Sequence, residues 1–395
     1  MRWQRSLDHL IAGFSGRPLA RLDAEVVDVL RLSLYQLLHL TRVPASAVVD
    51  DAVDLARAAR KPSASGFVNA VLRTMLRQRK HLPLPPRPDR AEERDAALAY
   101  LGITHSHPDW LVRRWLDRYG FEQTERWVQF NNETPPLTLR ANALRHQRDE
   151  VARMLAADDV ETAPTRYAPN GLTVTAGNPL RQPRLGAFFV QDEASQLVPL
   201  AVGTRPGEQV LDLCASPGGK TTAMAADMAG SGRIVACDVR PKRVALLEET
   251  VRASGASNIE VVKVDVTGAL TFAAFDRVLV DAPCSGLGTV RRDPDIKWRR
   301  QESDLPALAQ DQLTLLARAA AVVKPGGRLV YATCSSEPEE NEQVVDAFLA
   351  AHPEFDLVQL GDSLPSDLVD ARGMLRTLPF AHRLEAFFAA ALVRR

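Results

Sequence analysis

The first 80 residues alternate between apolar and polar positions with the period of an α-helix. Three apolar stripes are separated by a break at Val43-Pro44 and by the small-residue stretch 62–66. The pattern predicts a helical bundle over residues 1–82, which ends at the proline-rich stretch 82–88, where no regular element can continue. The stripes comprise Leu30, Leu34, Leu37 and Leu38, then Val48, Val49, Val53, Leu55 and Ala56, and then Phe67, Val68, Val71, Leu72, Met75 and Leu76.

The middle of the chain has a different pattern. Residues 83–130 are predicted to be a linker followed by a helix over 108–130. Residues 131–200 combine short expected strands at 136–140 and 172–175 with a helix at 150–157. This combination predicts a small α+β module, ferredoxin-like or RRM-like, over 131–200.

From about residue 205, short apolar strands alternate with helical stretches. The strands are rich in Val, Leu and Ile throughout, which is typical of parallel strands buried on both faces. The alternation predicts a Rossmann-like, doubly wound domain over residues 201–395, and the fold class is therefore multidomain, α plus α/β. The expected strands are 209–213, 233–237, 260–264, 277–280 and 328–332.

Composition and charge narrow the functional classes. The chain is 46% hydrophobic and 25% charged, and it has no apolar run of the roughly 20 residues that cross a bilayer. We therefore expect a cytoplasmic protein without membrane contact. The four cysteines form no Cys-x-x-Cys or Cys/His cluster, so we expect no metal. Residues 1–80 carry 13 Lys and Arg against 7 Asp and Glu, which favours an anionic partner, although a solvated helical face gives the same pattern.

A glycine-rich turn follows the first strand of the doubly wound domain, in the string LDLCASPGGKT at 211–221. Ligands bind beyond the carboxyl ends of parallel strands, and Gly218 and Gly219 let a ligand approach the backbone before a helix begins. Acidic residues follow the later strands: Asp238, suited to ribose hydroxyls, Asp265, suited to the adenine edge, and Asp281. The pattern predicts a site for a nucleoside-containing cofactor.

The turn excludes two common cofactor classes. It lacks the Gly-x-Gly-x-x-Gly of dinucleotide sites, and Cys214 stands where a phosphate-binding P-loop requires glycine. S-adenosylmethionine has a ribose and an adenine but no phosphate, so it is favoured over a purely structural turn. The expected cofactor contacts are Cys214, Ala215, Ser216, Pro217, Gly218, Gly219, Lys220, Asp238, Arg243, Asp265 and Asp281.

Two cysteines follow strands of the same domain, Cys284 in DAPCSG and Cys334 in YATCS. Carbon 5 of cytosine accepts a methyl group poorly, but addition of a thiolate to carbon 6 makes carbon 5 electron-rich. A second group must then remove the carbon 5 proton so that the thiol can leave. Asp281 is placed to hydrogen-bond or protonate nitrogen 3. Cys214 and Cys237 are interpreted as packed small hydrophobes.

Several strings resemble a known family. The helical strings resemble the NusB-like RNA-binding domain, and the turn and cysteine strings resemble the signature motifs of RNA 5-methylcytosine methyltransferases. Taken together, the chain resembles the Sun (Fmu) family of bacterial 16S rRNA cytosine-5 methyltransferases. The strings that carry the resemblance are 30–38, 66–73, 189–195, 214–221, 281–286, 291–298 and 331–335.

The resemblance implies roles for individual residues. The family's attacking thiol falls on Cys334 and the thiol that assists release falls on Cys284, whereas the DNA cytosine methyltransferases attack with the Pro-Cys thiol. The YATCS string favours the first assignment. The methyl donor is held by the residues that match Cys214–Lys220, Asp238, Asp265 and Asp281. The family's Asp-Gly-Phe-Phe is EAFF at 385–388 here, which is expected to crowd the final strand without removing a reacting group.

The segment 291–300 combines basic residues with a tryptophan, a composition suited to gripping RNA phosphate and stacking on a splayed base. A solvated loop with a half-buried Trp is the alternative. The target base must be unpaired or flipped. We expect a monomer that acts on 16S rRNA, unassembled or early in assembly. The predicted RNA contacts are Arg140, Arg291, Arg292, Lys297 and Trp298.

Three alternatives stay open from the residues. The same chemistry could act on tRNA or on another rRNA position. A non-catalytic RNA-binding protein with a vestigial fold is disfavoured because Cys284, Cys334 and Asp281 are all present. An amino-group methyltransferase would carry an Asn/Asp-Pro-Pro-aromatic motif where DAPC stands.

Overall fold

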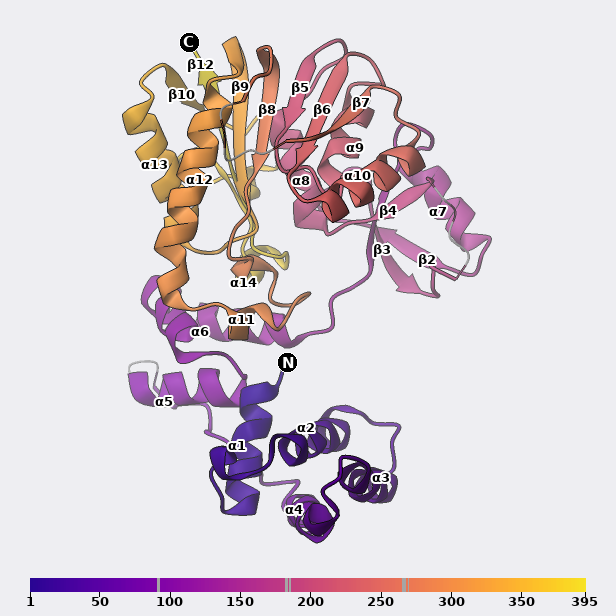
Figure 1. The fold of residues 1–395 in the computed structure, drawn as a ribbon, viewed down its shortest axis with the longest axis vertical. Helices are drawn as coiled ribbons and strands as arrows, with labels where there is room; N and C mark the ends of the chain where they lie inside the picture. The colour runs from indigo at the N-terminus through magenta and orange to yellow at the C-terminus, as the bar shows by residue number, and fades with distance from the viewer. Residues whose placement is uncertain (91–92, 182–183, 185, 265–267, 269) are drawn as a thin grey trace. The chain divides into compact units, whose positions relative to one another are not determined.

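A computed structural model of the chain describes residues 1–90, 93–181, 184, 186–264, 268 and 270–395 (Figure 1). The chain divides into two compact units. One comprises Met1–Glu133 and Lys297–Arg299, and the other comprises Thr134–Ile296 and Arg300–Arg395. None of the described helices is both long enough and apolar enough to span a membrane.

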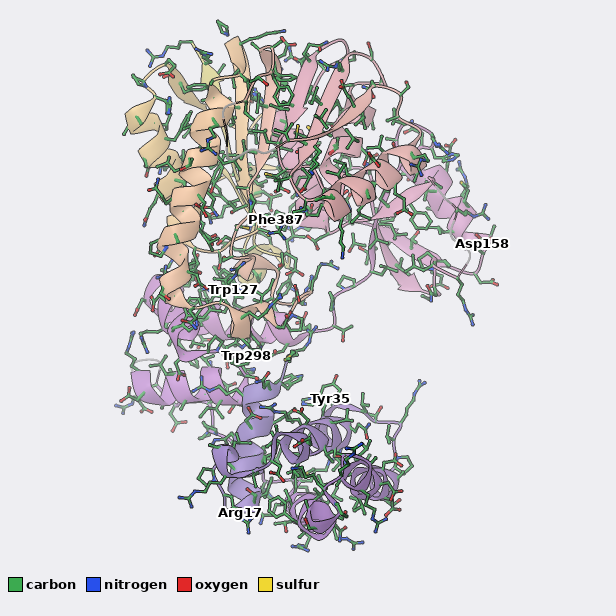
Figure 2. The ribbon with its side chains drawn as sticks, viewed as in Figure 1. Arg17, Tyr35, Trp127, Asp158, Trp298 and Phe387 are labelled. Atoms are coloured by element: carbon green, nitrogen blue, oxygen red, sulfur yellow. The ribbon has the colours of Figure 1, made fainter. Side chains whose placement is uncertain are left out.

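The first unit consists of helices, as its apolar stripes predict. Leu30, Leu34 and Leu72 are fully buried in its core, which the first four helices enclose. In the last long helix, Trp115 and Trp127 stack with their rings 4.6 Å apart (Trp127 is labelled in Figure 2). The helices are α1 (Gln4–Ser15), α2 (Ala24–His39), α3 (Ala45–Ala58), α4 (Ser65–Arg77), α5 (Arg94–Ala99) and α6 (Asp109–Asn132).

The second unit begins with a four-stranded antiparallel sheet, in the order β2-β3-β1-β4, that packs on one helix, α7. This is the predicted small α+β module. The expected strands 136–140 and 172–175 correspond to β1 and β3. The sequence of β2, ETAP, lacks an apolar signal, and β4, FFV, is apolar but only three residues long. The elements are β1 (Thr138–Ala141), α7 (Arg148–Ala156), β2 (Glu161–Pro164), β3 (Gly171–Ala176) and β4 (Phe188–Val190).

The rest of the second unit is built on an eight-stranded sheet. Its path is β10-β12-β9-β8-β5-β6-β7, and β11 pairs with β12. The five expected strands are β5 to β9, and their mutual pairings are all parallel. The C-terminal β12 pairs antiparallel with both β9 and β10, which extends the sheet beyond the strands that the periodicity predicted. The strands are β5 (Gln209–Asp212), β6 (Arg233–Asp238), β7 (Ile259–Lys263), β8 (Phe275–Asp281), β9 (Val323–Thr333), β10 (Phe355–Val358), β11 (Leu375–Arg376) and β12 (Phe388–Arg394).

Helices cover both faces of this sheet, which confirms the doubly wound, Rossmann-like fold. Successive residues of one strand point to opposite faces, so Val280 packs with α12 and α13 while Leu279 packs with α8 and α9. Figure 1 shows α12 and α13 in front of the sheet. The helices of this unit are α8 (Glu193–Val202), α9 (Gly219–Asp227), α10 (Pro241–Ser254), α12 (Leu305–Ala320), α13 (Glu342–Ala351) and α14 (Pro379–His382), whereas Lys297–Arg299 of the short α11 (Ile296–Arg299) belong to the first unit.

Candidate active site

The carboxyl ends of β5, β6, β8 and β9 carry most of the predicted site residues. Strands β8 and β9 are parallel neighbours, with Asp281 paired to Ala332. Cys284 follows β8 by three residues, and Cys334 directly follows β9. Adjacent parallel strands end at the same edge of the sheet, so the topology brings these two cysteines together.

The two thiols are in contact. The Sγ atoms of Cys284 and Cys334 lie 3.4 Å apart, and both residues are half-buried. The hydrogen bond to Cys334, together with burial, raises the pKa of Cys284 well above its ordinary value. Cys284 is therefore held as a thiol, and its proton is available to the Cys334 sulfur.

A buried ion pair lies beside the thiols. The Nζ of Lys220, at the start of α9, is 2.7 Å from Oδ2 of Asp281. Burial alone would lower the pKa of Lys220, but the negative charges of Asp281 and of a Cys334 thiolate raise it above its usual value. The Lys220 ammonium also lies 5.7 Å from the centre of the Phe387 ring (labelled in Figure 2). The positive charge of Lys220 therefore interacts with the Cys334 sulfur.

The predicted cofactor turn joins β5 to α9. Gly218 has φ of 104°, a left-handed conformation that other residues adopt only with strain. Asp238, at the end of β6, forms an ion pair with Arg243 at 3.0 Å. Arg243 also donates a hydrogen bond to the backbone oxygen of Ser216 at 2.7 Å. The turn and these two side chains thus form one linked group, and their contact with a cofactor stays a prediction. Asp265 lies outside the described residues.

The remaining cysteines are not placed for reaction. Cys237 is fully buried in the core of the sheet, where burial raises its pKa to about 12. Burial also raises the pKa of Cys214, with a contribution from the Asp212 carboxylate. Both thiols stay protonated, in agreement with their interpretation as packing residues.

Asp212, the last residue of β5, is a site residue that the sequence reasoning missed. It is fully buried and accepts a hydrogen bond from Thr221 Oγ1 at 2.7 Å. Its other oxygen has no hydrogen-bond partner among the described residues. Burial raises the pKa of this carboxyl to about 7. Its position in an otherwise apolar strand, LDLC, was the available signal.

The Asp212→Asn variant should have a flatter stability profile with pH. Because the folded-state pKa of Asp212 is raised to about 7, the folded protein keeps a proton that the unfolded chain has lost above about pH 4. Stability conferred by this group therefore falls as pH rises from about 4 to 7, by an amount on the order of a few kcal/mol. Urea unfolding of the cofactor-free protein at pH 5 and pH 8 measures this loss. An unchanged pH dependence in the variant would contradict the assignment.

The loop after Cys284 is fixed by contacts with two distant segments. The Gly288 N–H donates to the Cys334 backbone oxygen at 3.0 Å, and the Ala386 N–H donates to the Gly288 oxygen at 2.9 Å. A Cβ at Gly288 would lie 2.0 Å from the Ala386 oxygen, so no side chain fits there. Ala386 occupies the position of the glycine in the Asp-Gly-Phe-Phe string. Its side chain is buried, and its backbone N–H still donates to the Gly288 oxygen.

The Gly288→Ala variant should be less stable by about 1–3 kcal/mol, because the added methyl overpacks against backbone. Gly361→Ala is the matched control: a Cβ there meets nothing within 4 Å, so its free energy of unfolding should change by less than about 0.5 kcal/mol. Urea denaturation compares the two. Equal free energies of unfolding for both variants would show that the loop shifts to accommodate the added methyl at Gly288 without loss of stability.

Three of the predicted RNA contacts are buried. Arg291 pairs with Glu385 at 2.9 Å, and burial raises the pKa of that carboxyl to about 7. Lys297 donates to the backbone oxygen of Arg2 at 3.0 Å. Arg140 donates to Gln191 and Thr222 at 2.6 and 2.7 Å, and thereby braces the start of α9. These side chains are not presented to RNA in this structure.

The other two predicted RNA contacts are half-buried. Arg292 pairs with Asp192 at 2.6 Å, and Trp298 donates its Nε1–H to the Met1 oxygen at 2.8 Å. Contact between these two residues and RNA stays a prediction. In the part of the chain that the structure describes, no group of His, Cys, Asp and Glu is arranged to hold a metal ion.

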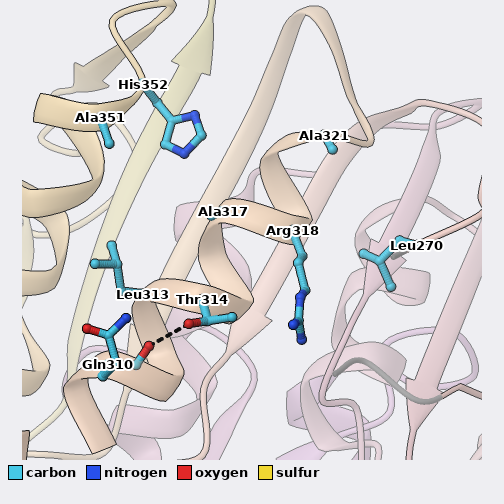
Figure 3. Close-up of a pocket in the computed structure, with 9 residues that line it drawn as sticks. All are labelled: Leu270, Gln310, Leu313, Thr314, Ala317, Arg318, Ala321, Ala351 and His352. Carbon is cyan, nitrogen blue, oxygen red and sulfur yellow. Dashed lines mark hydrogen bonds between the residues drawn. The ribbon is translucent and has the colours of Figure 1, made fainter. Parts of the chain in front are cut away.

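The second unit also has a hollow of about 610 Å³ that is separate from the predicted site (Figure 3). It lies along α12, where Thr314 donates to the Gln310 backbone oxygen at 2.8 Å. None of the predicted site residues lines it. Its lining residues are Leu270, Gln310, Leu313, Thr314, Ala317, Arg318, Ala321, Ala351 and His352.

Comparison with known proteins gives a consistent result for all parts of the chain. Residues 199–393 match the family model for 16S rRNA methyltransferase RsmB/F, residues 1–77 match the NusB family, and residues 107–181 match the ferredoxin-like domain of RsmF/B-like methyltransferases. These matches confirm the NusB-like and ferredoxin-like expectations. A methyltransferase family is also consistent with S-adenosylmethionine as the cofactor.

Individual relatives cover nearly the whole chain. The ribosomal RNA small subunit methyltransferase B of Sodalis glossinidius is 35% identical, over 100% of this chain and 87% of its own length. That of Pseudomonas putida is 37% identical, over 89% of this chain and 79% of its own length. A crystal structure of a methyltransferase homologue from Pyrococcus horikoshii is 26% identical, with a TM-score of 0.67 over 76% of this chain and 99% of that one. The chain therefore belongs to the family of 16S rRNA methyltransferases described as RsmB/F.

Proposed function

We propose that this enzyme methylates carbon 5 of a cytosine in 16S rRNA, with S-adenosylmethionine as methyl donor and a covalent bond between Cys334 and the base. The observation that carries the proposal is the contact between two thiols, 3.4 Å apart, at the ends of adjacent parallel strands. A single cysteine is often a packing residue. Two half-buried thiols beside a lysine–aspartate pair are suited to covalent catalysis.

The residues around the turn fit S-adenosylmethionine. Carboxylates stand at the ends of β5, β6 and β8, in Asp212, Asp238 and Asp281, and the cations near them are Lys220 and Arg243. This set suits a cationic, ribose-containing donor better than a phosphate. Asp212 also keeps a buried oxygen without a partner among the described residues. When bound, S-adenosylmethionine supplies an electrophilic methyl group.

The two thiols suit different steps. The raised pKa of Cys284 keeps that residue protonated, and the Lys220 ammonium supplies a positive charge near the Cys334 sulfur. The Cys334 sulfur adds to carbon 6 of the cytosine, and carbon 5 becomes electron-rich. After carbon 5 is methylated, a base takes the carbon 5 proton, the double bond between carbons 5 and 6 re-forms, and the Cys334 sulfur leaves carbon 6 with the electron pair of their bond. Cys284, in contact with the leaving sulfur, is placed to assist this release.

Asp281 has a second function in this scheme. Its Oδ2 is held by Lys220, and its side chain is about a quarter exposed, at 27%. A carboxylate fixed at the edge of the thiol site can accept a hydrogen bond from nitrogen 3 of the cytosine when that nitrogen carries a proton, and it thereby stabilises the protonated ring. That contact draws electron density from carbon 6 and assists attack by the thiolate.

The substrate is inferred from relatives, which are named as small-subunit rRNA methyltransferases. The test incubates the purified protein with S-adenosylmethionine and separate transcripts of 16S rRNA and tRNA, followed by nucleoside mass spectrometry. The expected product is 5-methylcytidine in 16S rRNA. Methylation of tRNA alone would favour the alternative substrate, and N4-methylcytidine would reject carbon 5 chemistry. If the protein binds S-adenosylmethionine but forms no methylated nucleoside, the result would favour a non-catalytic RNA-binding protein with a vestigial methyltransferase fold.

A further inference from the structure

One buried carboxylate connects the residues that follow both cysteines. Glu340, in the short 3₁₀-helix Pro338–Glu340, is fully buried. Its Oε1 accepts the Ser285 N–H at 2.7 Å, and its Oε2 accepts the Ser285 hydroxyl at 2.5 Å and the Ser335 hydroxyl. Ser285 directly follows Cys284, and Ser335 directly follows Cys334. One side chain therefore joins the two loops that carry the thiols.

The same residue is itself anchored on two sides. Gln312 of α12 donates to Glu340 Oε1 at 2.9 Å and to the Pro283 oxygen at 3.0 Å. The Tyr331 hydroxyl, from β9, donates to the Glu340 backbone oxygen at 2.5 Å. Helix α12 and both loops thus meet at one carboxylate, β9 bonds the backbone of the same residue, and Figure 1 shows α12 running alongside β9. All four groups that reach the carboxylate donate hydrogen bonds, and a carboxylate can accept at both of its oxygens.

We propose that Glu340 is a positioning residue that holds Cys284 and Cys334 in contact. The effect of Glu340 on catalysis rests on the proposed function, but its effect on the contact between the two sulfur atoms does not depend on the substrate. Without Glu340, the two loops lose the bonds that fix them to each other, and the sulfur atoms separate. A displacement of about 1 Å at a reacting group can cost about 100-fold in rate.

Three substitutions of Glu340 distinguish the effect of its side-chain length and hydrogen bonds from the effect of its negative charge. In Glu340→Gln, the amide oxygen can still accept from Ser285 N–H and Gln312, and the amide nitrogen can donate to hydroxyls that rotate to accept. In Glu340→Asp, the charge stays but the side chain is shorter. In Glu340→Ala, both are lost. Glu339→Gln is the matched control, because Glu339 lies in the same 3₁₀-helix and is only half-buried.

The first measurement is methyl transfer to the RNA substrate. For Glu340→Asp and Glu340→Ala we expect turnover about 100-fold below wild type, with KM for RNA and binding of S-adenosylmethionine unchanged. Glu340→Gln and Glu339→Gln should stay within about threefold of wild type. Wild-type turnover in Glu340→Asp, or equal losses in the Gln and Ala variants, would overturn the proposal. In the second case the charge, and not the hydrogen bonds, would be responsible.

The second measurement needs no RNA and no cofactor. Diamide takes up two electrons and two protons from the Cys284 and Cys334 thiols as their S–S bond forms, and mass spectrometry of the linked peptides follows the rate. Wild type and Glu340→Gln should form this disulfide quickly, and Glu340→Asp and Glu340→Ala about tenfold more slowly. Thermal melting confirms that each variant is folded. Equal rates in all folded variants would overturn the proposal even if Cys334 proves catalytic. Slower disulfide formation would support it even if the methylated atom is not carbon 5.

Discussion

The Cys334→Ala variant should lose methyl transfer by about a thousandfold or more, because the proposed bond to carbon 6 is made by the Cys334 sulfur. The half-buried thiol of Cys284 lies only 3.4 Å from that sulfur, but its raised pKa makes it a poor substitute nucleophile. Binding of S-adenosylmethionine should remain, since the cofactor turn after β5 does not use the Cys334 side chain. Transfer of a radiolabelled methyl group to RNA tests the loss of activity, and calorimetry tests whether S-adenosylmethionine still binds.

The control for this variant is Cys237→Ala. Cys237 is a buried core thiol on β6 whose pKa burial raises to about 12, so its loss should lower stability slightly and leave turnover near wild type. The comparison separates loss of a nucleophile from loss of packing. Retained turnover in Cys334→Ala would remove Cys334 from the mechanism, whatever the fate of the proposed role of Glu340.

The meeting of the two cysteines could be predicted because it depends on topology. Short apolar strands at 277–280 and 328–332 indicated parallel neighbours, and parallel neighbours bring their following loops together. The structure confirms this pairing as β8 and β9. The glycine turn before α9 and the acidic residue after β6 were predictable for the same reason. The local sequence pattern, together with the rule that functional loops follow the carboxyl ends of parallel strands, was sufficient to place these residues.

The parts that the sequence did not predict depend on partners far along the chain. Glu340 connects Ser285 and Ser335, and Gly288 packs on Ala386, almost 100 residues later. No local periodicity encodes such contacts. The basic segment 291–300 gave a misleading surface signal, since charge composition cannot show that Arg291 is neutralised by the buried Glu385. Long-range pairing therefore converts a predicted RNA-binding residue into a structural one.

In the proposed mechanism, these long-range contacts would let the two thiols act in sequence. Gly288 binds the Cys334 backbone from one side, and Glu340 binds the residues after both cysteines from the other. The loops are therefore fixed as a pair, which lets one sulfur depart while its neighbour stays within reach. A pair held only by its own hydrogen bond would separate once Cys334 bonded to a base.

The Cys284→Ala variant should accumulate a covalent protein–RNA adduct. Addition of Cys334 to carbon 6 needs only the Cys334 sulfur and the charge of Lys220, whereas release requires the neighbouring thiol. With substrate RNA and S-adenosylmethionine, we expect a slowly migrating band on denaturing electrophoresis that nuclease treatment removes. Turnover should fall about 100-fold, because each enzyme molecule is held after its first reaction.

The double variant Cys284→Ala/Cys334→Ala is the control for this adduct, since it keeps the RNA-binding surface but has no attacking thiol. It should give no shifted band. An adduct in Cys334→Ala instead, with none in Cys284→Ala, would show that the two thiols have exchanged roles, as in the DNA cytosine methyltransferases. The raised pKa of Cys284 argues for the first outcome, because a thiol that stays protonated is a poor nucleophile but can still donate a hydrogen bond to the departing Cys334 sulfur.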